Sequence, residues 1–194
     1  MRQAGIALPA PDSTTPRMRI LGWLITTAAT IGLLALASRW AIPMTPVPIT
    51  LQTLAVTLAG ALLGWRHGAL AVALWLALGA AGLPVLAGGG AGLAKFAGPT
   101  AGYLFAFPVA AAAVGLLMTR GGWDRSWPLA IAAMLVGNAV CLGGGAAWLA
   151  WHGQSAARVW ASGIEPFLIG AALKALAGGL AMRWLAANGF RTPR

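Results

Sequence analysis

Six long apolar stretches separated by short polar breaks constrain this chain more than any other feature. A helix of about 20 apolar residues is long enough to cross the hydrocarbon core of a bilayer. Only 8% of the residues are charged, whereas soluble domains carry about 25%. We therefore expect an all-α integral membrane protein with six transmembrane helices. The predicted spans are about residues 20–41, 51–65, 67–83, 98–118, 128–150 and 163–185.

The domain organisation follows from these stretches. The second and third are short and adjoin at GWRHG (64–68), where a charged residue marks a membrane interface. The first nineteen residues lack the apolar core of a signal peptide. The sequence thus predicts a disordered cytoplasmic tail at 1–19, a six-helix transmembrane domain at 20–187 and a cytoplasmic C-terminal tail at 188–194.

The basic residues are unevenly divided between the two sides of the membrane. With the N-terminus inside, nine of the thirteen lie on the cytoplasmic side and three outside, while Lys174 falls within the sixth span. This bias follows the positive-inside rule and predicts that both termini are cytoplasmic. The cytoplasmic set is Arg2, Arg17, Arg19, Arg66, Arg120, Arg125, Arg183, Arg191 and Arg194, and the outer set is Arg39, Lys95 and Arg158.

The net charge of +10 also bears on the class of partner. Basic residues clustered at helix ends favour contact with the anionic headgroups of the lipid bilayer. The sequence has no basic run with interleaved aromatic residues. We therefore exclude nucleic acid as a partner.

Side chains that could carry catalysis are scarce. An intramembrane hydrolase needs paired aspartates, a Ser–His pair or a metal motif such as H-E-x-x-H, and none of these occurs. A lone Cys141 excludes an internal disulfide and a thiolate metal site. We expect no catalytic residue, no metal and no cofactor. The acids and histidines of the chain are Asp12, Asp124, Glu165, His67 and His152.

Hydrogen-bonding side chains follow a stiff loop at the outer end of the second span. The loop lies within IPMTPVPITLQT (42–53), whose three prolines cannot continue a helix. Thr50, Gln52 and Thr53 come next and begin the span. Helix capping accounts for Thr50 alone, so we expect these residues to contact a ligand arriving from outside.

A second polar group opens the fourth span at GPTAGY (98–103), with Thr100 and Tyr103 on its first turn. The free N–H groups at a helix N-terminus suit a carbonyl or a carboxylate. The glycine-rich loop 87–92, which includes Gly88, precedes this span and is flexible enough to act as a lid. Both features lie on the outer side in the predicted topology.

Two polar residues lie inside predicted spans, and each allows two interpretations. Asn138 either hydrogen-bonds a neighbouring helix or contacts a ligand. Lys174 stands eight residues beyond Pro166, about 12 Å along a helix. It either extends towards the interface or binds an anion, because its own helix offers no nearby carboxylate.

Several ordered motifs carry a resemblance to a known family. The motifs are IPMTPVPITLQTLAVTLAGALLG (42–64), GLPVLAGGGAG (82–92), GPTAGYLFAF (98–107), and Gly137–Asn138 followed by Trp148–Leu149. Over about residues 20–185 the chain resembles the BioY family, the biotin-binding S-components of energy-coupling factor transporters.

The resemblance implies the six-helix S-component fold in a bacterial cytoplasmic membrane, with 20–187 as the substrate-binding domain. It implies capture of biotin from outside beneath a lid made by the loops after the first and third helices. It further implies uptake with a transmembrane T-component and two cytoplasmic ATPase subunits. The family's small-xxx-small motif for the T-component corresponds approximately to Ala28 and Gly32, which internal helix packing also explains.

Two positions depart from the family's pattern. The sixth helix usually reads Gly-Asp-x-x-Lys, whereas this chain has GAALK (170–174), with Ala171 in place of the acid and Lys174 retained. A tyrosine often found four residues after the asparagine is replaced by Leu142.

The predicted function is therefore binding of biotin in a largely apolar cavity open to the outside. Gln52 and Asn138 offer both donors and acceptors to the ureido ring, and Lys174 offers a cation. The sequence leaves open which end of biotin meets Lys174. The alternatives are an S-component for another small vitamin, a channel, or a structural membrane subunit.

Overall fold

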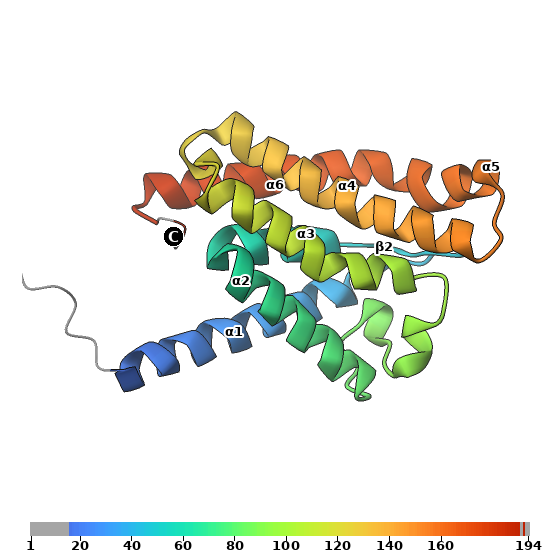
Figure 1. The fold of residues 1–194 in the computed structure, drawn as a ribbon, viewed down its shortest axis with the longest axis horizontal. Helices are drawn as coiled ribbons and strands as arrows, with labels where there is room; N and C mark the ends of the chain where they lie inside the picture. Colours follow the sequence, from blue (N-terminus) through green and yellow to red (C-terminus); the bar gives the residue numbers. More distant parts are fainter. Residues whose placement is uncertain (1–15, 191, 193–194) are drawn as a thin grey trace, which may run out of the picture.

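The computed structural model describes residues 16–190 and 192, and within that range the chain is mostly helical (Figure 1). Two pairs of residues form a short antiparallel ribbon, in which Ala41 pairs with Thr50 and Ile42 with Ile49. The ribbon closes the proline-rich loop on itself. The α-helices and strands are α1 (Pro16–Arg39), β1 (Ala41–Ile42), β2 (Ile49–Thr50), α2 (Gln52–Ala80), α3 (Ala101–Thr119), α4 (Trp127–Trp151), α5 (Ala156–Val159) and α6 (Glu165–Ala187).

Short helical turns connect these elements. Two 3₁₀ turns, Ala87–Gly89 and Leu93–Phe96, lie in the loop between α2 and α3. A third, Trp123–Arg125, joins α3 to α4. A π-helical turn, Trp160–Ile164, leads from α5 into α6.

Helix α2 reverses direction at Gly64. Gly64 has φ +77° and ψ 174°, values that no helix contains and that glycine adopts without steric cost. A Cβ on Gly68 would lie 2.7 Å from the carbonyl oxygen of Ala59, so the two halves of α2 pack almost backbone to backbone. The break predicted at 64–68 is therefore present, and its physical basis is one glycine.

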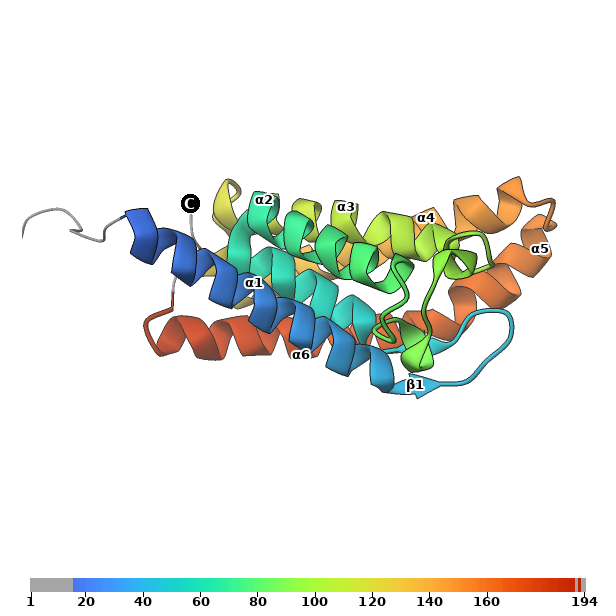
Figure 2. The same ribbon diagram turned by 90° about the horizontal axis from the view of Figure 1, so that it is seen from below.

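The two ends of the bundle differ in what they carry. The start of α1, the reversal in α2, the α3–α4 connection and the end of α6 lie at one end, as both ribbon views show (Figures 1 and 2). The β1–β2 loop, the α2–α3 loop and α5 lie at the other. Arg66 and Arg120 both approach the ring of Trp65, at 4.6 and 5.4 Å, which gathers basic charge at the first end.

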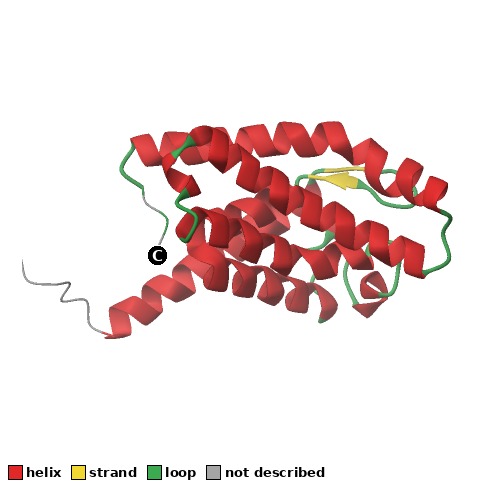
Figure 3. Cartoon of the chain, turned by 45° about the horizontal axis from the view of Figure 1, so that its top comes forward, coloured by secondary structure: helices red, strands yellow, loops and turns green. Residues whose placement is uncertain are grey.

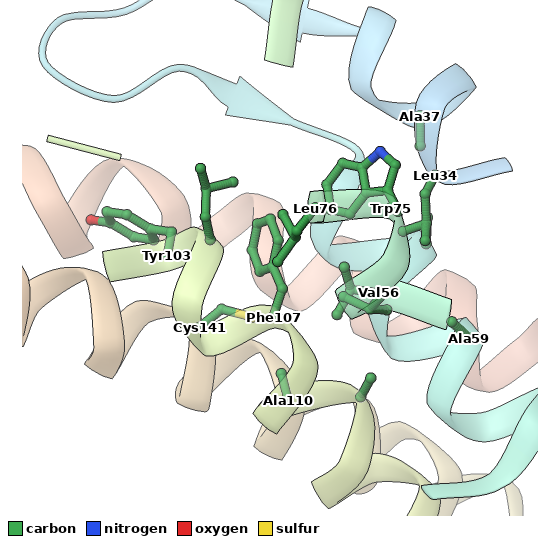
Figure 4. Close-up of a cluster of buried hydrophobic side chains, with 14 of the residues drawn as sticks. Leu34, Ala37, Val56, Ala59, Trp75, Leu76, Tyr103, Phe107, Ala110 and Cys141 are labelled. Atoms are coloured by element: carbon green, nitrogen blue, oxygen red, sulfur yellow. The ribbon is translucent and has the colours of Figure 1, made fainter. Parts of the chain in front are cut away.

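A dense apolar core joins α1, α2, α3 and α4 (Figure 4). Trp75 is fully buried, stacks on Phe107 at 6.0 Å between ring centroids, and donates from Nε1 to the carbonyl oxygen of Val85 at 3.0 Å. A second cluster, built around Met118, Met134 and Met182, fills the opposite end of the bundle. The first cluster lies directly beside the polar residues described below.

The outer surface is apolar to an extent that a soluble protein does not tolerate. Ile169 is 77% exposed, and large aliphatic side chains face outward along every long helix. Among the described residues five helices are long and apolar enough to cross a membrane: Ile20–Arg39 within α1, then α2, α3, α4 and the continuous segment Ala156–Ala187.

The helix boundaries differ from the predicted ones at several ends. Helix α1 begins at Pro16, so residues 16–19, predicted as part of a tail, are helical, while 1–15 lie outside the described residues. Helix α6 ends at Ala187, where the predicted domain ends, and of the predicted C-terminal tail the structure describes residues 188–190 and 192.

Candidate functional site

A cavity of about 390 Å³ lies at the loop-bearing end of the bundle. Its floor and sides come from α2, α3, α4 and α6, and its rim from the β1–β2 and α2–α3 loops, which gather at that end (Figure 3). Most of its lining is apolar, with a few polar side chains. The lining residues are Pro46, Val47, Pro48, Thr50, Gln52, Thr53, Leu86, Ala87, Ala94, Lys95, Gly98, Pro99, Thr100, Tyr103, Leu104, Phe107, Asn138, Cys141, Leu142, Phe167, Ala171 and Lys174.

Lys174 is held by oxygens of β2 and α2 rather than by an acid. Its ammonium donates to the carbonyl oxygen of Thr50 at 3.1 Å and to Oγ1 of Thr53 at 2.6 Å. These contacts offset part of the cost of burying a cation in an apolar wall. The sequence left open whether Lys174 extends towards the interface or binds an anion, and its two protein partners come from β2 and α2. Binding of an anion by Lys174 stays a prediction. An ammonium has three donors, so two protein contacts leave one for a ligand.

Gln52 is the first residue of α2 and is buried at 4% exposure. Its Nε2 donates to Oγ of Ser38 at 3.0 Å, and Oγ of Ser38 donates to the carbonyl oxygen of Leu34 at 2.6 Å. The hydroxyl of Thr50 donates to Oε1 of Gln52 at 3.0 Å. The carboxamide is thereby oriented from both ends, and α1 is tied to the cavity wall.

Asn138 lies on α4, next to a glycine whose lack of a side chain allows close helix packing. A Cβ on the preceding Gly137 would lie 2.6 Å from methyl groups of Thr57 and Val114, so α4 packs tightly on α2 and α3. Nδ2 of Asn138 donates to the carbonyl oxygen of Met134 at 2.9 Å, one turn back in its own helix. Of the two interpretations of Asn138, the structure shows a bond within its own helix rather than one to a neighbouring helix, and contact with a ligand stays a prediction.

Tyr103 spans the cavity wall from α3 towards α6. Its hydroxyl donates to the carbonyl oxygen of Gly163 at 2.6 Å, within the π-helical turn. Its ring lies 6.0 Å from that of Phe167. Nε1 of Trp148 donates to the carbonyl oxygen of Gly98 at 3.0 Å and so fixes the end of the loop beside Thr100.

The structure brings seven of the eight predicted ligand-binding residues to one cavity. These residues, far apart in sequence, are Thr50, Gln52, Thr53, Thr100, Tyr103, Asn138 and Lys174. Gly88 is the exception: it is exposed, and its neighbour Ala87 lines the cavity instead. Successive positive φ angles at Gly88 (+63°) and Gly89 (+76°) form the tip of this turn, away from the lining. Ligand binding by all eight stays a prediction.

The two residues predicted to dock a partner lie on the outer face of α1. Ala28 and Gly32 are exposed, and a Cβ on Gly32 would meet nothing within 4 Å. Internal packing therefore does not account for either residue among the described parts of the chain. The span Ile20–Arg39 has the smallest buried share of the five membrane-length helices, so α1 is the one least enclosed by the described part of the fold.

Sequence reasoning missed the apolar side chains that shape the cavity and one cation at its rim. Phe107, Cys141 and Phe167 line it, yet in sequence they look like any core residue. Lys95 also lines it, from the α2–α3 loop. Its position in the outer loop next to GPTAGY was a usable signal, because both flank the same predicted opening.

The electrostatic character of the cavity is positive. Both lysines of the chain, Lys95 and Lys174, line it, while the described arginines all lie elsewhere. The described acids, Asp124 and Glu165, are not part of the lining. No cluster of metal-binding side chains was found among the described residues. This wall can hold an apolar molecule that carries a carboxylate and neutral hydrogen-bonding groups.

Comparison with known proteins identifies relatives along most of the chain. The model of the BioY family matches residues 11–189. A protein of Rhodobacter capsulatus named biotin transporter BioY is 55% identical over 98 residues, which are 50% of this chain and 48% of that relative. A protein of Rhizobium etli with the same name is 43% identical over 129 residues, 63% of this chain and 69% of the relative. The first match thus spans about half of the relative's length.

A solved structure is similar over nearly the whole fold. It is described as the crystal structure of the S-component for biotin from an ECF-type ABC transporter. The TM-score is 0.78 at 31% sequence identity, and the match covers 90% of this chain and 95% of that one.

Proposed function

The chain belongs to the BioY family, and from that membership we propose that it is the biotin-binding S-component of a vitamin uptake transporter. It is a multi-pass protein of the cytoplasmic membrane that captures biotin from the outer side and delivers it inward with an energy-coupling module. It does no chemistry on the ligand.

The observation that carries this proposal is the match between the cavity and the three parts of biotin. The apolar lining suits the thiophane ring and the valeryl chain. Gln52, Asn138 and Lys174 supply donors and acceptors for the ureido ring. A cavity with two ammonium groups and no carboxylate among the described lining residues favours a ligand with one carboxylate. A volume of about 390 Å³ is in the usual range for small-molecule sites.

The proposed topology has six crossings, with α2 counted as two short spans that meet at Gly64. Both termini are then cytoplasmic, and the cavity opens outward. Support comes from the end of the bundle that gathers Arg66, Arg120 and Arg183, where the first two flank Trp65 and the third approaches Trp127 at 5.9 Å. Basic residues accumulate on the cytoplasmic side of membrane proteins.

The proposed partners are a transmembrane T-component and two cytoplasmic ATPase subunits. We assign the docking site of the T-component to the outer face of α1. Ala28 and Gly32 are exposed on this face, and a Cβ on Gly32 would meet no atom of the rest of the described fold within 4 Å. Small residues let helix backbones approach closely in lipid, where association depends on packing rather than on the hydrophobic effect.

The experiment that tests the function is mass spectrometry of protein purified in detergent without added ligand, followed by equilibrium binding of biotin, dethiobiotin, thiamine and riboflavin. We expect co-purified biotin and a clear preference for biotin. Preference for another vitamin would retain the S-component fold and reject the substrate. Ion flux in liposomes without partners would indicate a channel, and binding of none of these molecules would favour a structural subunit.

A further inference from the structure

We propose that Lys95 in the α2–α3 loop binds the carboxylate of the ligand, while Lys174 serves the ureido end. The proposal rests on the proposed function, since it assigns the two ends of biotin within that cavity. It makes Lys95 a specificity residue for an anionic ligand tail.

The distribution of lysine in the chain is the first observation. The chain has two lysines and eleven arginines, and both lysines line this one cavity. The described arginines lie outside the lining. Lysine carries a compact charge on a flexible stem, which suits a single carboxylate that enters and leaves. Membrane topology and contact with lipid headgroups explain where the arginines lie, but they do not explain why both lysines line one cavity.

The two ammonium groups have different surroundings. This difference decides which end of biotin each one meets. Lys174 is partly buried and already donates to Thr50 and Thr53. Its remaining donor suits a neutral oxygen such as that of the ureido group. Lys95 is exposed at the rim. The free carboxylate of biotin loses least hydration when it stays near the opening.

The loop is built to hold Lys95 in this place. Its backbone is anchored on α2, because Gly92 donates to the carbonyl oxygen of Gly79 at 2.8 Å, and Lys95 donates to that of Gly92 at 3.2 Å. Gly90 has φ −66°, which any residue can adopt, so conformation does not require glycine there. A Cβ on Gly90 would lie 2.7 Å from Cε of Lys95 and 3.3 Å from Nζ. The missing side chain leaves the space that the lysine occupies.

The carboxylate assignment separates the two lysines by ligand chemistry. Biotinamide keeps the ureido and thiophane rings and carries no charge on its tail. Loss of the Lys95 charge therefore affects biotin and leaves biotinamide unchanged. Loss of the Lys174 charge affects both ligands, since both keep the ureido group.

The test measures dissociation constants of biotin and biotinamide for the parent protein and for Lys95→Met, Lys95→Glu and Lys174→Met. Arg158→Met is the matched control, because it removes an exposed positive charge from the same end of the bundle outside the cavity lining. We expect Lys95→Met to weaken biotin about two- to fivefold, as for a solvent-accessible ion pair. Lys95→Glu should weaken it further. Biotinamide should change less than about twofold in both, within the scatter of surface substitutions.

Equal loss for both ligands in Lys95→Met, or no loss for either, would overturn the assignment. So would Lys174→Met if it weakened biotin and spared biotinamide. Lys95 is exposed, so its variants are expected to fold, and Lys95→Arg, which keeps the charge, should restore most of the affinity for biotin. If the parent protein binds neither ligand, the proposed function fails. If the parent binds both ligands and the Lys95 variants do not discriminate between them, the carboxylate assignment alone fails.

Discussion

Replacement of Lys174 by methionine offers the sharpest measure of how the site works. Methionine keeps most of the length of the side chain and its apolar stem, and it removes the charge and the donors. In the parent protein the ammonium donates to Thr50 and Thr53 and has one donor left for the ligand. A hydrogen bond with a charged partner contributes about 1.5–3 kcal/mol. Loss of the ligand contact should therefore weaken biotin about ten- to a hundredfold.

The same substitution has two opposing effects on the protein without ligand. It removes two hydrogen bonds and leaves the carbonyl oxygen of Thr50 without this donor, which costs about 1–3 kcal/mol. It also removes a partly buried cation, and burying a charge costs several kcal/mol before compensation. The net change in the free energy of unfolding should stay within about 2 kcal/mol of zero.

The assay combines isothermal titration with biotin and thermal unfolding in detergent, on the parent protein, Lys174→Met and Thr53→Val. Thr53→Val is the matched control, because it removes one acceptor of the ammonium and keeps the charge. It should weaken biotin less than Lys174→Met does. Biotin binding by Lys174→Met as tight as in the parent would refute the reasoning, since the lysine would then only bridge α6 to β2 and α2.

Three further predictions address the cavity, the topology and the loop. Ala171→Asp places a carboxylate in the buried cavity wall, three residues from Lys174, where the described lining residues include no acid. The new carboxylate should accept a ureido N–H and tighten the binding of biotin about tenfold. Weaker binding in a titration would mean that the acid only neutralises the lysine. A reporter active only in the cytoplasm should be active when fused near Asp124 and inactive near Gly90, and activity at Gly90 would reject an outward-facing cavity. Hydrogen exchange at residues 87–92 should slow when biotin binds, and unchanged exchange at saturation would rule out closure of this loop.

Much of the helical framework could be predicted because the controlling signals are local. The break in α2 depends on Gly64, and the sequence around it, GWRHG, already contains the interfacial charge. The start of α3 at Ala101 follows from Pro99 just before it. By contrast, helix α1 begins at Pro16, earlier than expected, because a polar and basic first turn is invisible to a search for apolar residues.

The polar residues that line the cavity could be predicted from the sequence, but the hydrogen bonds between them could not. Thr50, Asn138 and Lys174 stand out because polar residues are rare in these spans. The acceptors of Lys174, however, are 124 and 121 residues away in sequence, and only the packing of α6 against β2 and the start of α2 brings them within reach. Gly88 lies outside the cavity lining, whereas Ala87 lines it. Glycines next to one another look alike in a sequence, so the sequence does not tell which residue of the loop faces the cavity.

Helix α1 connects the proposed partner surface to the cavity through few contacts. Its outer face presents Ala28 and Gly32, while Ser38, near its end, accepts a hydrogen bond from Gln52 in the cavity wall. Gln52 in turn accepts one from Thr50, whose carbonyl oxygen receives Lys174. A shift of α1 that separates Ser38 from Gln52 leaves a buried carboxamide donor unpaired, which costs about 1–3 kcal/mol. If the proposed partner docks on the outer face of α1 and moves this helix, the Ser38–Gln52 contact would change with it, so we expect docking and ligand affinity to be coupled through α1.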